Sequence, residues 1–216
     1  MYKYQISLIQ ILSSIFLLFL SNFLIQYLLI YNPSITITYT FITFLTASIL
    51  FYFNRDLLTS HYKRFRTLED QKLFYLIGTI AFTVFLLVNK YFLNAYIYLI
   101  NPESIIDFPI YGLNFILAFT FINAFIYAIV FRLSVKIIKI KNNELLVIIL
   151  SGIIYGILYS ATLLPISIFE FITNFIFYFM ISLCFSYFYN QSNNIFNPAL
   201  AYGSGLLIIN LINILL

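Results

Sequence analysis

The sequence predicts an all-α bundle that crosses a membrane about seven times, with its N-terminus inside and its C-terminus outside. Three observations support this: 63% of the 216 residues are hydrophobic, 8% are charged, and the mean hydropathy is +1.01. Soluble domains are about one quarter charged, and a domain of this size leaves much of its surface in water. Lipid is therefore the expected solvent. Because hydrocarbon offers the backbone no hydrogen-bond partner, long apolar runs are expected to be helices.

Seven apolar segments account for the spans, since about 20 residues cross a bilayer core. The first follows Lys3 without a small-residue cleavage site, which predicts an anchor rather than a removable signal peptide. The third, of about 28 residues, is long enough to tilt or to end in an interfacial turn. We expect one membrane domain, residues 1–216, with these spans: Ile6–Tyr31, Ile35–Phe53, Leu73–Ile100, Tyr111–Phe131, Leu145–Leu164, Ile166–Tyr189 and Ile195–Leu216.

Small residues at three- and four-residue intervals predict where these helices pack closely, because they let two backbones approach. Internal packing is the favoured interpretation, and a ligand or dimer surface is the alternative. Such faces occur in the second, fifth and last segments: Thr36, Thr40, Thr43 and Ala47; Gly152, Gly156 and Ser160; Ala199, Ala201, Gly203 and Gly205.

Basic residues predict the orientation, since they gather on the cytoplasmic side of membrane proteins. Nine of the eleven Lys and Arg lie in the N-terminal tail, in the loop Asn54–Lys72 and around residues 136–144: Lys3, Arg55, Lys63, Arg64, Arg66, Lys72, Lys136, Lys139 and Lys141. The net charge of +4 follows from this bias, so we expect no nucleic-acid partner. Lys63, Arg64 and Arg66 are expected to lie on anionic lipid headgroups, at about 1 kcal/mol each. A protein-docking segment is the alternative.

Titratable side chains are scarce in the predicted spans, and this scarcity limits the chemistry. The one histidine, His61, is expected in the loop Asn54–Lys72, and the seven carboxylates fall outside the middle of any span. A metal site needs several converging ligands, and a serine nucleophile needs a base beside it. We therefore expect no metal, no cofactor and no catalytic residue. Cys184 lies in an apolar run and is interpreted as a packing residue rather than a reactive thiol.

The C-terminal half, about residues 111–216, resembles the CAAX protease and bacteriocin-processing (CPBP, or Abi) family of intramembrane proteins. The stretch from Tyr127 to Arg132 corresponds to the family's Glu-Glu-x-x-Phe-Arg. The stretch from Tyr155 to Tyr159 corresponds to Phe-x-x-x-His. The stretch Asn194–Tyr202 corresponds to Asn-Ile-x-x-Pro-x-x-x-His, which the family follows with an asparagine four residues later.

This resemblance implies a degenerate member of the family, a pseudoprotease. The glutamate pair falls on Tyr127 and Ala128, the two histidines on Tyr159 and Tyr202, and the last asparagine on Leu206. Only the arginine, Arg132, is present. If the family fold is kept, the three tyrosines converge and fill the space of the lost site, with their hydroxyls paired to each other or to Arg132. The alternative is that they are scattered interfacial anchors.

Four functions are consistent with these observations. The first is a non-catalytic scaffold or regulatory partner of another membrane or cell-envelope protein, a role that the resemblance implies. The others are a bacteriocin-immunity or resistance factor, a small permease subunit, and a protease that uses an unrecognised site. The abundance of Ile, Phe, Tyr, Asn and Lys is typical of an AT-rich bacterial genome, and the resemblance implies a multi-pass protein of a Gram-positive cell membrane.

Overall fold

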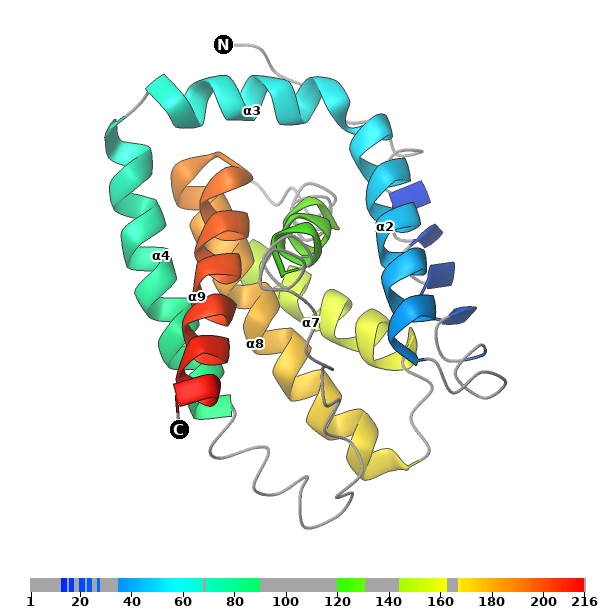
Figure 1. Cartoon of the computed structure of the whole chain (residues 1–216). Coiled ribbons are helices and arrows are strands. Elements are labelled where there is room, and N and C mark those ends of the chain that lie inside the picture. Colours follow the sequence, from blue (N-terminus) through cyan, green and yellow to red (C-terminus); the bar gives the residue numbers. More distant parts are fainter. Residues whose placement is uncertain are drawn as a thin grey trace.

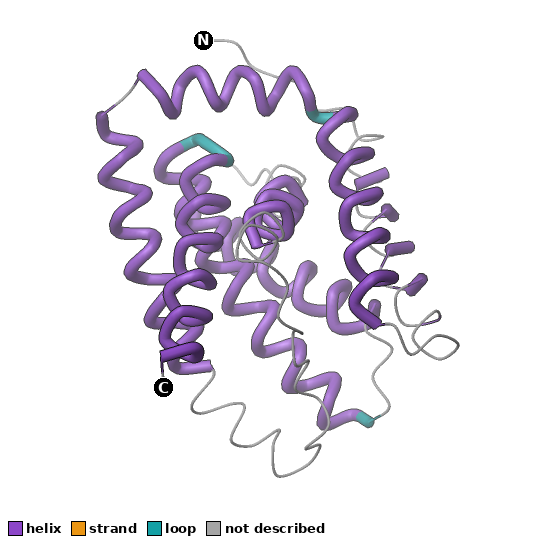
Figure 2. Tube along the Cα trace, in the orientation of Figure 1, coloured by secondary structure: helices purple, strands orange, loops and turns teal. Residues whose placement is uncertain are grey.

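The computed structural model describes residues 35–67, 69–89, 120–130, 144–162 and 167–215, with scattered positions between 13 and 27. Within these ranges every regular element is a helix (Figure 2). The elements are α2 (Ile35–Phe53), α3 (Arg55–Thr67), α4 (Glu69–Val88), the helical segment Thr120–Val130, α7 (Glu144–Thr162), α8 (Ile168–Ser192) and α9 (Phe196–Leu215). The predicted all-α class is therefore confirmed for the described residues.

Two helices, α4 and α8, are long and apolar enough to cross a membrane, and the bent pair of α2 and α3 could form a third span. The seven spans and the orientation stay predictions. Most of the first predicted span, the end of the third and the beginning of the fourth lie outside the described residues, as do Arg132 and the basic residues 136–141.

The largest correction concerns the predicted loop Asn54–Lys72. It is a helix, α3, followed by the first turn of α4, which begins at Glu69 rather than at Leu73. Asn54 breaks the chain direction, so that the axes of α2 and α3 differ by 82°. Figure 1 shows α3 running across one end of the molecule, from α2 on one side to α4 on the other. The prediction was wrong because the high density of charge in 54–72 was interpreted as loop, although leucines and aromatic residues recur among the charges at helical spacing.

The turn between α8 and α9 is fixed by two consecutive asparagines. Asn193 has a left-handed backbone (φ 51°, ψ 34°) and donates its N–H to the carbonyl of Tyr189 at 2.7 Å, which ends α8. The side-chain oxygen of Asn194 then accepts the N–H of Phe196 at 3.0 Å, which starts α9. The chain thus reverses in three residues, and the two helices stay adjacent.

Small residues bring the helices together in two pairs, α4 with α9 and α7 with α8. A Cβ built on Gly78 of α4 would lie 2.9 Å from the Cβ of Ala201 in α9. A Cβ built on Gly152 or Gly156 of α7 would lie 3.0–3.2 Å from side chains of α8. Ser160, Ala199, Gly203 and Gly205 are also buried. The small residues of α7 and α9 are therefore packed inside this chain, and Thr43 and Ala47 of α2 are both buried, whereas the side chains of Thr36 and Thr40 lie outside the described residues.

Candidate functional site

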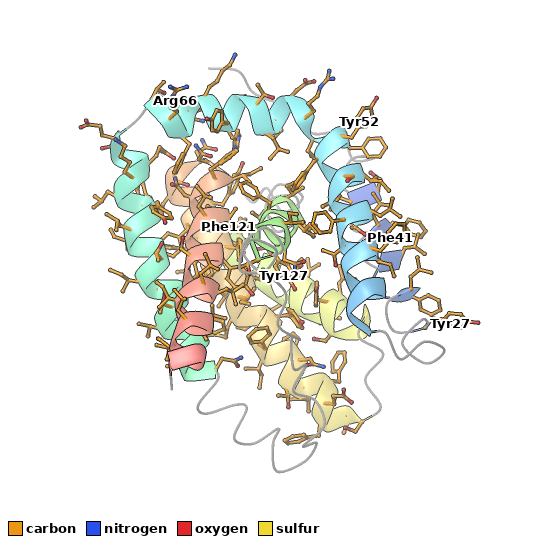
Figure 3. The ribbon with its side chains drawn as sticks, viewed as in Figure 1. Tyr27, Phe41, Tyr52, Arg66, Phe121 and Tyr127 are labelled. Carbon is orange, nitrogen blue, oxygen red and sulfur yellow. The ribbon has the colours of Figure 1, made fainter. Side chains whose placement is uncertain are left out.

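The three tyrosines singled out in the sequence lie together in the interior. Tyr127 comes from the segment Thr120–Val130, Tyr159 from α7 and Tyr202 from α9. The hydroxyls of Tyr127 and Tyr159 are hydrogen-bonded at 2.9 Å. The rings of Tyr127 and Tyr202 meet edge to face, with centroids 5.9 Å apart. Tyr127 points into the helix bundle in Figure 3. The predicted convergence is confirmed, and scattered interfacial anchors are excluded for these three residues.

Two further tyrosines belong to this group. Tyr155 stacks on Tyr159 with centroids 5.5 Å apart, and Tyr178 of α8 approaches the ring of Tyr159 to 3.9 Å. We call Tyr127, Tyr155, Tyr159, Tyr178 and Tyr202 the tyrosine cluster. The spacing of Tyr155 and Tyr159 puts both on one face of a helix and was a signal available in the sequence. Nothing in the sequence pattern placed Tyr178 opposite them.

Phenylalanines close the cluster on the side of α4 and α8. Phe82 meets the ring of Tyr202 edge to face at 5.4 Å, and Phe185 lies 5.2 Å from the same ring. Both phenylalanines are fully buried. The interior at this level is consequently built from aromatic rings of four helices and the segment Thr120–Val130, and edge-to-face contacts of this kind stabilise a packed core.

The other predicted positions of the degenerate site have ordinary packing roles where they are described. Ala128 is buried in the core, and Leu206 is half-buried against it. Cys184 is also half-buried against the core, in agreement with its interpretation as a packing residue. Arg132 lies outside the described residues, so its predicted pairing with the tyrosine hydroxyls stays a prediction. Among the described residues, no group of three His, Cys, Asp or Glu is placed to hold a metal ion.

A second polar group, missed in the sequence, joins α3 to the turn between α8 and α9. His61 was expected in a loop, but it lies in α3, is only 8% exposed, and stacks its ring on Tyr189. Its Nδ1 accepts the N–H of Ile195 at 3.0 Å, and its backbone oxygen accepts a hydrogen bond from the side-chain amide of Asn194 at 3.1 Å. The histidine is thus a structural hydrogen-bond acceptor at the junction of three helices.

The side chains around His61 extend this connection to α4. Gln71 donates from Nε2 to the carbonyl of Ser192 at 3.3 Å, and its Oε1 accepts a hydrogen bond from Asn197. At the rim, Arg64 donates to the carbonyl of Asn193 at 3.4 Å. We call His61, Gln71, Asn194 and Asn197 the polar clasp. Because buried polar groups must find partners, these residues fix the position of α3 over the start of α9.

Comparisons of the chain with protein-family models, with curated proteins and with solved structures found no match. The described residues themselves show helices, two or three of which are long and apolar enough to cross a membrane, together with an interior of packed aromatic rings and the polar clasp at one end.

Proposed function

We propose that this chain is a non-catalytic multi-pass protein of a bacterial cell membrane that acts as a scaffold or regulatory partner of another membrane or cell-envelope protein. The supporting observation is the tyrosine cluster. It fills the interior with rings, and the hydroxyls of Tyr127 and Tyr159 bond to each other at 2.9 Å. Tyrosine titrates near pH 10 in water and is a poor base for activating a water molecule at neutral pH.

The resemblance to the CPBP family is part of the same proposal. In that family the positions of Tyr127, Tyr159 and Tyr202 carry the groups that activate water and stabilise the oxyanion. Tyr127 contacts both Tyr159 and Tyr202 directly here. This contact supports the view that aromatic packing has replaced a hydrolytic site and that the fold has been kept for binding.

The proposed topology has seven spans, with the N-terminus in the cytoplasm and the C-terminus outside. Lys63, Arg64, Arg66 and Lys72 are exposed around the junction of α3 and α4, which supports a cytoplasmic location for that end of the molecule. Fusions of a cytoplasmic and an extracytoplasmic reporter after Thr67 and after the C-terminus test this arrangement. The first position should report the cytoplasm and the second the outside.

The outer faces of the helices are suited to binding another transmembrane helix. On α4, large aliphatic side chains recur on one exposed face: Leu73, Ile77, Ile80, Val84 and Val88. On α8 a second exposed face contains Ile168, Ile172, Ile176 and Met180. In lipid, helices associate through close packing of this kind of surface rather than through a hydrophobic driving force. A partner helix on one of these faces would leave the interior unchanged.

Affinity purification of the tagged chain from native membranes in mild detergent, with mass spectrometry of retained proteins, tests the function. One membrane protein recovered in near-equal amount supports the scaffold. Two variants then locate the surface: alanines at Ile77, Ile80 and Val84 on α4, and matched alanines at Ile172, Ile176 and Met180 on α8. Only one variant should lose the partner, because the two faces belong to different helices.

Two outcomes oppose this proposal. Purification of the chain alone from several mild detergents contradicts the scaffold role, and protection of cells against membrane-active peptides would then identify the immunity role. Peptide cleavage by the pure protein that is lost in Tyr127→Phe or Tyr159→Phe contradicts the absence of catalysis.

A further inference from the structure

The outward face of α3 is a basic surface held at the level where α4 begins. α3 ends at Thr67 and α4 starts at Glu69, so only one residue separates the two helices. Tyr62 and Phe65 of α3 pack on Phe196, the first residue of α9, with ring centroids 5.7 and 6.0 Å away. If α4 crosses the membrane, as the proposed function assumes, α3 lies in the plane of the membrane at one surface of the bilayer (Figure 1).

The three cations on this surface form no ion pair with a carboxylate of the described residues, and the nearest exposed acidic residues along the chain are Glu69 and Asp70 at the start of α4. Lys63, Arg64 and Arg66 are all exposed, and Figure 3 shows Arg66 projecting outward at the end of the molecule. Among the described residues, the ion pair on α3 is Arg55 with Asp56 at 3.7 Å, one helix turn or more away from these three cations. Arg64 also donates a hydrogen bond to the carbonyl of Asn193. Within the described part of the chain, the side chains of Lys63 and Arg66 form no such hydrogen bond.

One exposed aromatic ring lies beside the cations, and another lies at the opposite end of α3. Tyr62 is 51% exposed on α3, and Tyr52 is 74% exposed at the bend that precedes it. Tyrosine is enriched at membrane interfaces because its ring is apolar and its hydroxyl is wet. These rings therefore place the level of α3 at the boundary between hydrocarbon and headgroups.

The dimensions agree with this placement. The headgroup layers make up roughly 10–15 Å of a bilayer about 40–45 Å thick, so each layer is roughly 5–8 Å deep. A helix is about 10–12 Å across with its side chains. A helix resting on the ends of the spans is therefore wider than the headgroup layer is deep, so that it fills the layer and extends into water. Its long lysine and arginine side chains can bend back to the depth of the lipid phosphates.

We propose that Lys63 and Arg66 of α3, with Arg64 beside them, form a binding surface for the headgroups of anionic phospholipids. The polar clasp gives this surface a fixed position, because His61 and Asn194 hold α3 to the turn between α8 and α9. An acidic segment of a protein is the competing occupant. The in-plane position of α3 and the exposed rings of Tyr52 and Tyr62 favour lipid.

The test is lipid selection by the purified full-length chain in nanodiscs made with equal amounts of phosphatidylglycerol and phosphatidylcholine. Lipids that remain bound after transfer to detergent are quantified by mass spectrometry. The wild-type protein should retain phosphatidylglycerol preferentially. In the variant Lys63→Gln/Arg66→Gln, the ratio of bound phosphatidylglycerol to phosphatidylcholine should fall by up to about fivefold for each cation removed. This factor is the equivalent of about 1 kcal/mol per charge.

Two controls make the result specific. The charge-preserving variant Lys63→Arg/Arg66→Lys should keep the preference, and Arg55→Gln, which removes a cation already paired with Asp56, should change it less. Raising the salt to 1 M, where the Debye length is about 3 Å, should weaken the preference. Inorganic phosphate at 10 mM should not displace the bound lipid, because the surface is complementary to a membrane rather than to a free ion.

Three results overturn the proposal: no preference for phosphatidylglycerol in the wild-type protein, an unchanged preference in Lys63→Gln/Arg66→Gln, or complete displacement by inorganic phosphate. The measurement needs no protein partner. A scaffold that retains its partner without selecting anionic lipid would therefore refute this inference alone, and lipid selection by a chain with no partner would leave the inference standing while the scaffold fails.

Discussion

Replacing His61 with phenylalanine tests how α3 is held against the end of the bundle. The substitution keeps an aromatic ring that can stack on Tyr189 but removes the Nδ1 acceptor. The N–H of Ile195, now bonded to that nitrogen at 3.0 Å, would lose its partner, and Ile195 is fully buried, with 0% exposure. A buried donor left unsatisfied costs about 1–3 kcal/mol. The substitution would therefore weaken the attachment of α3 to the turn between α8 and α9 by about this amount.

Trypsin provides the assay, because α3 contains its own cleavage sites. Lys63 and Arg66 lie in the middle and near the end of the helix, and a protease cuts such sites only when the helix opens locally. If opening is fast relative to cleavage, the rate follows the population of the open form. A loss of about 1–3 kcal/mol therefore corresponds to roughly 5- to 140-fold faster cutting at these two positions. Peptide mass spectrometry identifies the sites.

His61→Asn is the matched comparison. The Oδ1 of asparagine occupies the place of the histidine Nδ1, so this variant keeps the acceptor and loses the ring. If the hydrogen bond fixes α3, His61→Phe is cut much faster than His61→Asn. The reverse order would show that ring packing on Tyr189 holds the helix. Wild-type cutting rates in His61→Phe would refute the role assigned to the histidine.

Three further substitutions probe the packing and the turn. In a double-mutant cycle monitored by unfolding in detergent, Tyr127→Phe and Tyr159→Phe should show a coupling of about 0.6 kcal/mol, the average for hydrogen bonds between membrane helices. A coupling of zero would mean that the hydrogen bond between the two hydroxyls does not contribute to stability. Gly78→Ala should destabilise the protein by about 1–3 kcal/mol in the same assay, because the added Cβ would lie 2.9 Å from that of Ala201. The second change Ala201→Gly should restore most of the loss, and failure of this rescue would contradict the direct contact. Asn193→Ala should lower the free energy of unfolding by about 1 kcal/mol, because alanine is strained at the φ of 51° that Asn193 adopts. Asn193→Gly should leave the free energy of unfolding nearly unchanged. Equal effects of the two substitutions would contradict the left-handed turn.

The helical class and the packing faces were predictable because they depend on local pattern. The glycines at 152 and 156 and the run of apolar residues around them are adjacent in the sequence, and four-residue spacing has one geometric meaning in a helix. The convergence of Tyr127, Tyr159 and Tyr202 followed from the resemblance of their surroundings to a known family rather than from any periodicity. The resemblance itself stays a proposal.

The polar clasp could not be predicted because its partners are distant in the chain. His61 and Ile195 are separated by 134 positions, and Gln71 and Asn197 by 126. A histidine among lysines and arginines looks like part of a solvated loop. Only the right-angle bend at Asn54, which lays α3 across the start of α9, turns one face of that charged segment toward the interior. Leu57, fully buried four residues before His61, belongs to the leucines and aromatic residues whose helical spacing is the local sign of such a face.

The pairing of α4 with α9 has a consequence for how the chain is made. Tyr75 and Ser204, whose hydroxyls bond at 2.8 Å, are 129 residues apart. At about 5–20 residues per second, a ribosome that has completed α4 takes roughly 6–25 seconds more to synthesise α9. In the proposed membrane topology, the face of α4 around Gly78 has lipid or another protein as its neighbour during that interval, and Gln71 lacks its later partner Asn197. In a nascent chain that stops short of α9, the Gln71 side chain of α4 would thus still lack its partner. The quality-control machinery of the membrane would meet α4 in that state.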